Sequence, residues 1–172
     1  VRHQIVSGTH AIALALFGVL RPGGRLVAAF GKPYDTLEGI IHGKEGYGSL
    51  GELGVSYSEV AADASGGPDY GRIAEASSKS EAVLIQRSRG YSTRKPLSVE
   101  EIGRICEVVR DANPDAVTIV DNCYGEFTDV MEPCSVGADL MAGSLIKNPG
   151  GGVAPAGGYV AGRAELVEKA AS

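Results

Sequence analysis

Two charged residues that each follow an apolar run, Asp121 and Lys147, are the strongest candidates for chemistry in this sequence of 172 residues. Asp121 ends the run 117–120, and Lys147 comes shortly after the run 139–142 and just before a proline and three glycines. An acid closing one strand and a lysine following a later one suit pyridoxal 5'-phosphate, because the lysine holds the aldehyde as a Schiff base and the acid keeps the pyridine nitrogen protonated. Alone, each residue also fits a loop acid or a surface lysine, and their pairing favours the cofactor.

The segment Ser7-Gly8-Thr9 precedes a predicted helix and could bind the phosphate of that cofactor. The first turn of a helix offers unpaired backbone N–H groups and the positive end of the helix dipole, and both attract an anion. Ser144 lies three residues before Lys147, so its hydroxyl could reach the same phosphate. Ser7 has an alternative role as a simple N-cap, since serine is among the commonest N-cap residues.

Three further residues have both a functional and a structural interpretation. Tyr34 follows a predicted strand at the edge where open α/β sheets bind ligands, so it could stack on the pyridine ring or could be a packing tyrosine. His10 could contact the cofactor, but the sequence slightly favours a histidine that only pairs at the helix start. Cys123 follows Asp121 by two residues and lacks a histidine or aspartate partner, which favours a small buried residue over a nucleophile.

Composition excludes several classes of function. The net charge of −5 comes without a basic block, which argues against nucleic acid, and no apolar stretch approaches the length of a membrane span. Three cysteines without metal-ligand spacing indicate a reduced, cytoplasmic protein with no metal site. The segment 39–45 is similar to a nucleotide-binding loop, but it is one residue short and has Glu45 where a magnesium-binding Ser or Thr is needed.

Helical and strand-like segments alternate along the chain, which predicts an α/β fold with a parallel sheet. The chain opens on an extended segment at 1–4, and Ser98 with Glu101 forms a predicted capping box. Without internal repeats or linkers, residues 1–172 are expected to form one domain. The predicted helices cover 11–20, 70–77, 98–112 and 163–172, and the predicted strands cover 25–30, 55–60, 82–86, 116–121, 139–144 and 157–161.

These motifs resemble those of fold-type I pyridoxal phosphate enzymes of cysteine and methionine metabolism. Val120-Asp121-Asn122 is similar to that group's pyridine-nitrogen strand, and the segment from Ser144 to Lys147 is similar to its lysine segment. The closest resemblance is to the bacterial aluminium resistance proteins, a branch also described as methionine gamma-lyase-like. It covers essentially the whole chain and is carried by the segments 4–11, 86–91 and 120–127.

The resemblance implies the large cofactor-binding domain of such an enzyme, a three-layer α/β domain with a mostly parallel seven-stranded sheet. Enzymes of this group are about twice as long, and this chain lacks an initiator Met. We therefore expect residues 1–172 to be a fragment without the N-terminal segment and the C-terminal small domain. The small domain of these enzymes carries the arginine that binds the substrate carboxylate, so that residue is expected outside this chain.

The activity implied by the resemblance is a pyridoxal-phosphate-dependent carbon–sulfur lyase that acts on a sulfur-containing amino acid. The alternatives are an aminotransferase or another reaction on the same cofactor, or a fragment without activity. The segments Pro33–Thr36 and Arg87–Gly90 depart from the gamma-lyase pattern and leave the substrate open. The expected partners are a small amino acid and further copies of the chain, in a homodimer or homotetramer. The predicted catalytic residues are Lys147 and Asp121, and the cofactor-binding residues are Ser7, Gly8, Thr9, Tyr34, Asp121, Ser144 and Lys147.

Overall fold

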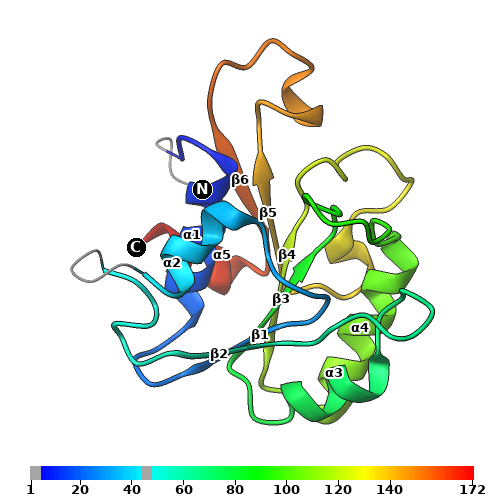
Figure 1. Ribbon diagram of the computed structural model, residues 1–172. Helices are drawn as coiled ribbons and strands as arrows, with labels where there is room; N and C mark the ends of the chain where they lie inside the picture. The colour runs from blue at the N-terminus through cyan, green and yellow to red at the C-terminus, as the bar shows by residue number, and fades with distance from the viewer. Residues whose placement is uncertain (1–4, 44–47) are drawn as a thin grey trace.

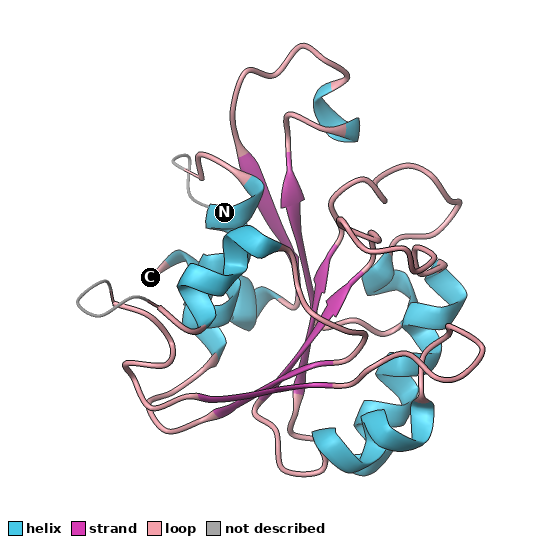
Figure 2. Cartoon of the chain, viewed as in Figure 1, coloured by secondary structure: helices cyan, strands magenta, loops and turns pink. Residues whose placement is uncertain are grey.

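The computed structural model describes residues 5–43 and 48–172, which form a three-layer α/β fold around a twisted sheet (Figures 1 and 2). The strands are β1 (Arg25–Ala28), β2 (Ser56–Glu59), β3 (Ala82–Gln86), β4 (Val117–Asp121), β5 (Leu140–Ser144) and β6 (Gly158–Gly162). The α-helices are α1 (Gly8–Val19), α2 (Glu38–Ile41), α3 (Tyr70–Ser77), α4 (Val99–Ala112) and α5 (Ala164–Ala171). Short 3₁₀ turns lie at Asp35–Leu37, Pro133–Val136 and Asn148–Gly150.

The strand order β2-β1-β3-β4-β5-β6 brings the carboxyl ends of five parallel strands to one edge of the sheet. The pairs from β2 through β5 are parallel, and β6 runs antiparallel to β5. The chain moves outward from β1 to β2 and then returns to the other side of β1 at β3. This reversal is the kind of switch point at which open α/β sheets bind ligands, outside the carboxyl ends of the strands.

Helices cover both faces of the sheet because its central strands are apolar on both sides. All residues of β3 are buried, and α1 and α5 pack on one face while α3 and α4 pack on the other (Figure 1). Helices α1 and α5 approach closely at Gly18, where an added Cβ would lie 2.7 Å from the backbone nitrogen of Ala170. The helices on both faces therefore cover the apolar sides of the central strands, whose ends border the site.

The predicted α/β class, the near-parallel sheet and the capping box are confirmed. The Glu101 N–H donates to Ser98 Oγ at 3.1 Å, and the Ser98 N–H donates to Glu101 Oε2 at 2.8 Å. The described residues supply six strands, where the resemblance implied seven. Before α1 begins, residues 5–7 are described; the carbonyls of Ile5 and Val6 accept hydrogen bonds from the Gly158 and Gly157 N–H groups beside the start of β6 without forming a strand.

The strand predicted at 55–60 is shorter in the structure, where β2 covers Ser56–Glu59 at the edge of the sheet. Its half-buried alternation is present, because Val55 is buried and Tyr57 is partly covered while Ser56 and Ser58 are exposed. The apolar residues that suggested burial, Val55 and Val60, are buried but lie just outside the strand. The extended start predicted at 1–4 lies outside the described residues, as do Lys44 and Glu45 of the segment that is similar to a nucleotide-binding loop.

Candidate active site

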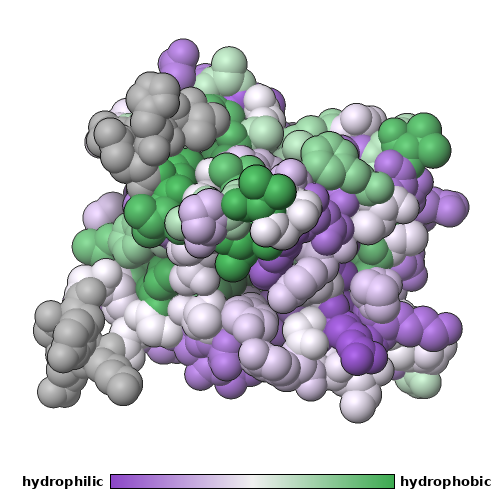
Figure 3. Space-filling model, turned by 90° about the horizontal axis from the view of Figure 1, so that it is seen from above, coloured by the Kyte–Doolittle hydropathy of each residue, from purple (hydrophilic) through white to green (hydrophobic). Residues whose placement is uncertain are grey.

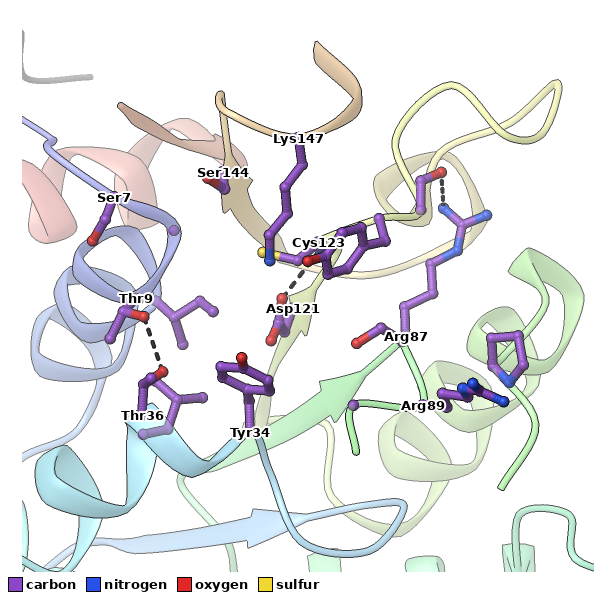
Figure 4. A pocket seen from close by; sticks show the side chains of 18 of the residues that line it. Ser7, Thr9, Tyr34, Thr36, Arg87, Arg89, Asp121, Cys123, Ser144 and Lys147 are labelled. Carbon is purple, nitrogen blue, oxygen red and sulfur yellow. Dashed lines mark hydrogen bonds between the residues drawn. The ribbon is translucent and has the colours of Figure 1, made fainter. Parts of the chain in front are cut away.

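A cavity of about 770 Å³ lies at the carboxyl ends of the parallel strands and contains all seven predicted site residues in its lining. They come from the start of α1, the loop after β1, and the ends of β4 and β5. In Figure 4, Lys147 points down into the cavity toward Asp121, and Tyr34 lies on the opposite side of it. The structure thus brings Tyr34, Asp121 and Lys147 to one cavity, whereas their chemical roles stay predictions.

The start of α1 forms one wall of the cavity. Ser7 is the N-cap, and its Oγ accepts a hydrogen bond from the His10 N–H at 3.1 Å. The N–H groups of Gly8 and Thr9 occupy the first two helical positions, where a helix supplies no acceptor of its own. Ser7 thus caps the helix and also lines the cavity, and its contact with a phosphate stays a prediction.

Gly8 is placed where a larger residue would not fit. An added Cβ at Gly8 would lie 2.9 Å from Ser144 Cβ and 3.2 Å from Cys123 Sγ. This close approach brings the start of α1 against the ends of β4 and β5, so the Ser144 hydroxyl and the free N–H groups border the same space. Beside them, the hydroxyl oxygens of Thr9 and Thr36 lie 3.0 Å apart. The chemistry of this corner, hydroxyls and N–H groups at a helix start, fits a phosphate.

Asp121 lies at the end of β4 and is 3% exposed. Burial raises the pKa of its carboxyl, and the hydrogen bond from the Cys123 N–H to Oδ1 at 3.1 Å and the nearby charge of Lys147 oppose that rise. A buried carboxyl that gains from a cationic neighbour is suited to a protonated ring nitrogen. The same burial raises the pKa of the Cys123 thiol to about 12, which supports the interpretation of Cys123 as a small buried residue.

Lys147 follows β5 in a turn and has no salt-bridge partner in residues 5–43 or 48–172. Its Nζ lies 4.0 Å from the centroid of the Tyr124 ring. The amine is partly exposed and lines the cavity, so a carbonyl compound in the cavity can reach it. The position fits the predicted Schiff-base lysine.

Tyr34 contacts another tyrosine in the structure. Its ring stacks on Tyr91 with centroids 5.2 Å apart and an interplanar angle of 29°, and the two hydroxyl oxygens lie 2.8 Å apart. That hydrogen bond raises the pKa of Tyr34 to about 12. Stacking of Tyr34 on a cofactor ring stays a prediction; the structure adds that Tyr91 shares this wall of the cavity.

Several cavity residues were missed as site residues by the sequence analysis, namely Thr36, Arg87, Arg89, Tyr91 and Tyr124. Arg87 is 5% exposed, and its guanidinium donates to Asn122 Oδ1 at 2.9 Å and to the Gly125 carbonyl at 2.8 Å. An arginine directly after the apolar strand β3 was a usable signal for a buried, paired charge. Tyr124 had no such signal, because only the conformation of its loop brings it beside Lys147.

No cluster of three or more His, Cys, Asp or Glu side chains suited to a metal ion occurs within the described ranges. In the same ranges, every helix is too short or too polar to cross a membrane.

The fold and the cavity define an α/β domain of the pyridoxal-phosphate transferase type. A similar arrangement occurs in the pyridoxal-5'-phosphate-dependent protein YhfS from Escherichia coli, with a TM-score of 0.70 at 21% identity over 96% of this chain and 41% of that one. The family model described as methionine gamma-lyase matches residues 1–172, and the chain belongs to this family. The predicted membership is confirmed.

Relatives at higher identity are consistent with this assignment. The chain is 52% identical over 171 residues to the protein YnbB of Bacillus subtilis, covering 98% of this chain and 41% of that one. A carbon–sulfur lyase involved in aluminium resistance from Clostridium novyi has a TM-score of 0.91 at 45% identity, with 98% of this chain and 41% of that one covered. A Listeria monocytogenes protein, provisionally described as a cystathionine beta-lyase involved in aluminium resistance, has a TM-score of 0.93 at 49% identity, with coverage of 98% and 43%. The chain thus spans less than half the length of these relatives.

Proposed function

We propose that the protein containing this chain is a pyridoxal-5'-phosphate-dependent carbon–sulfur lyase that acts on a sulfur-containing amino acid. The observation that carries the proposal is the convergence of Lys147, Asp121 and the start of α1 in one cavity. The description of the Clostridium novyi relative as a carbon–sulfur lyase supports the choice of reaction. The family membership supports the choice of cofactor.

Each residue has a distinct task in this proposal. The cofactor supplies an electron sink for the negative charge that develops on the substrate carbon. Lys147 Nζ would be the amine that holds the cofactor aldehyde and, when free, would move protons at the substrate carbon atoms and to the departing sulfur. Asp121 would accept a hydrogen bond from the ring nitrogen, while the Gly8 and Thr9 N–H groups and the Ser144 hydroxyl would hold the phosphate.

The exposed apolar side chains near the cavity support a proposal about assembly. Phe127 is 77% exposed, Val130 is 99% exposed and Val153 is 87% exposed, all on loops beyond the carboxyl ends of β4 and β5. Figure 3, which looks down on this face, shows green apolar side chains between the purple hydrophilic ones. We propose that this face packs against a second copy in a homodimer or homotetramer, which light scattering of the full-length protein measures directly.

The test of the activity uses the full-length protein with pyridoxal 5'-phosphate and a panel of sulfur amino acids. We expect a visible absorbance band that borohydride removes, and release of a thiol with a keto acid from at least one substrate. Transfer of the amino group to an added keto acid without thiol release would instead establish the aminotransferase alternative. Absence of any cofactor band in a correctly folded protein would refute the cofactor assignment.

A further inference from the structure

The Lys147 side chain rests on an aromatic ring. Its Nζ lies 4.0 Å from the centroid of Tyr124, well inside the roughly 6 Å range of a cation–π interaction. The described residues offer the ammonium no carboxylate within salt-bridge distance. The face of the Tyr124 ring is therefore the contact that the structure shows for this charge.

The backbone of Tyr124 has an unusual conformation for an aromatic residue. Its φ angle is +67°, in the left-handed region that a side chain with a Cβ rarely adopts. Such a conformation is unfavourable for a residue with a Cβ and persists only where the surroundings impose it. The ring is also 62% exposed, so burial of apolar surface does not explain the strain. A strained and exposed aromatic residue beside a reactive lysine points to a functional reason for its position.

Two side chains hold Tyr124 in this conformation. Asn148, the neighbour of Lys147 in the chain, donates from Nδ2 to the Tyr124 carbonyl at 3.1 Å and to the Glu126 carbonyl at 2.9 Å. From the other side, the buried Arg87 donates to the carbonyl of Gly125 at 2.8 Å. The segment that carries the lysine and the loop that carries the ring are thus tied together directly, and their spacing is fixed.

We propose that Tyr124 is a positioning residue that holds the ammonium form of Lys147 in the cavity whenever the amine is not bonded to a carbonyl carbon. An amine attacks a carbonyl only with its lone pair free, so an aromatic face that stabilises the ammonium slows the condensation with an aldehyde. The inference uses the proposed function only to explain why a reactive lysine is useful; the contact itself is independent of the cofactor.

The test measures the reactivity of the lysine toward formaldehyde, with cyanoborohydride supplying the hydride, in the cofactor-free full-length protein. Mass spectrometry follows the methylation of Lys147 relative to Lys169, an exposed lysine in α5 that serves as an internal reference. In Tyr124→Leu we expect the ratio to rise about 3- to 10-fold, the range that corresponds to loss of one cation–π contact. Tyr124→Phe keeps the ring and should stay within about twofold of the unsubstituted protein.

Phe127 provides a matched control. It is also aromatic and exposed, and it has a left-handed backbone with φ of +59°, but no cation–π contact to it is found among the described residues. Phe127→Leu therefore makes a comparable change in the same loop. Phe127 also lies on the face proposed to pack against a second copy, so this variant measures any effect of assembly on the Lys147 ratio, and the rise in Tyr124→Leu should exceed it. An equal rise in Phe127→Leu and Tyr124→Leu, or no rise in Tyr124→Leu, would overturn the proposal.

A second measurement needs no substitution at Tyr124. Methylation with ¹³C-formaldehyde keeps the positive charge and leaves NMR-visible methyl groups on Lys147, whose signal Lys147→Arg identifies by its disappearance. A methyl group over the face of the ring should resonate upfield of the other lysine signals because of the ring current. A signal at the position of an exposed lysine would contradict the inference, even if Tyr124→Leu did not fold. Both readouts are free of the cofactor, so failure of pyridoxal phosphate to bind would refute the proposed function without deciding this one.

Discussion

The two halves of the cavity are built differently. Its inner half consists of Gly8, Asp121 and Ser144, which are buried at the ends of α1, β4 and β5. Its outer half consists largely of aromatic residues on loops, with Tyr91 81% exposed and Tyr124 62% exposed. Regular elements fix side chains more rigidly than loops do. The inner half is therefore suited to hold one cofactor in one geometry, and the outer half to be completed by other parts of the full-length protein.

Lys147→Ala should have the largest effect, since it removes the amine that would bond the cofactor held by the inner half of the cavity. We expect the rate of thiol release to fall at least about a thousandfold, as for loss of a covalent catalyst, together with the visible band that borohydride bleaches. Lys169→Ala removes an exposed lysine from α5 and should leave both signals unchanged. A bleachable band in Lys147→Ala would mean that another lysine bonds the cofactor.

Asp121→Asn tests the buried acid next. The variant should still bind pyridoxal phosphate but turn over on the order of a hundredfold more slowly, because one preorganised electrostatic partner is lost. Steady-state thiol release checks the turnover, and absorbance checks the cofactor content. Turnover close to that of the unsubstituted protein would remove Asp121 from the catalytic residues. It would also contradict the proposal that the buried inner half holds the cofactor in one geometry.

Asp121→Asn should lower turnover, but in the absence of cofactor it should stabilise the folded protein. Burial raises the pKa of Asp121 in the folded state above its unfolded value. The folded state then holds the proton more tightly, so stability is lost as pH rises from the unfolded pKa through the folded pKa. At neutral pH, Asp121→Asn should raise the free energy of unfolding by about 1–3 kcal/mol, and this gain should vanish at a pH below the unfolded pKa. Urea denaturation at both pH values measures the difference; a neutral or negative change at pH 7 would contradict it.

Gly8→Ala probes the close contact between α1 and β5. The added methyl group would lie 2.9 Å from Ser144 Cβ, so we expect a loss of about 1–3 kcal/mol in stability and a roughly tenfold weaker affinity for pyridoxal phosphate. Gly39→Ala is the control, because no atom of the described residues lies within 4 Å of an added Cβ there and alanine favours a helix. Thermal unfolding and cofactor titration compare the two variants. Equal stability and equal cofactor affinity in the two variants would show that α1 can move away from β5 at Gly8 without loss of the site.

Tyr91→Phe should have the smallest effect, since it changes an exposed side chain of the outer half. It removes the 2.8 Å contact with the Tyr34 hydroxyl but keeps the stacked ring. We expect less than about 0.5 kcal/mol in stability and less than about a threefold change in cofactor affinity, as is usual for exposed surface positions. A larger loss of cofactor affinity would show that the outer half also binds the cofactor.

The sequence predicted the inner half well for physical reasons. Asp121 was predicted because a carboxylate that ends an apolar strand needs a compensating partner. Ser7-Gly8-Thr9 was predicted because helix starts have recognisable capping residues. For the fold, alternating helical and apolar segments sufficed to predict the α/β class. The alternating burial of 55–58 was also predicted from the sequence, but the position of β2 at the edge of the sheet was not, because it depends on neighbouring strands and a local pattern does not contain that information.

The sequence by itself determined the fold class, the residues at the strand and helix ends, and the family to which the chain belongs. Tertiary structure alone decided which loops share the cavity. The stacking of Tyr34 on Tyr91 joins residues far apart in the chain, and the contact of Tyr124 with Lys147 depends on a left-handed backbone imposed by Asn148 and the loop around it. Such contacts depend on the geometry between distant segments, whereas caps and strand ends depend on local chemistry that neighbouring residues already express.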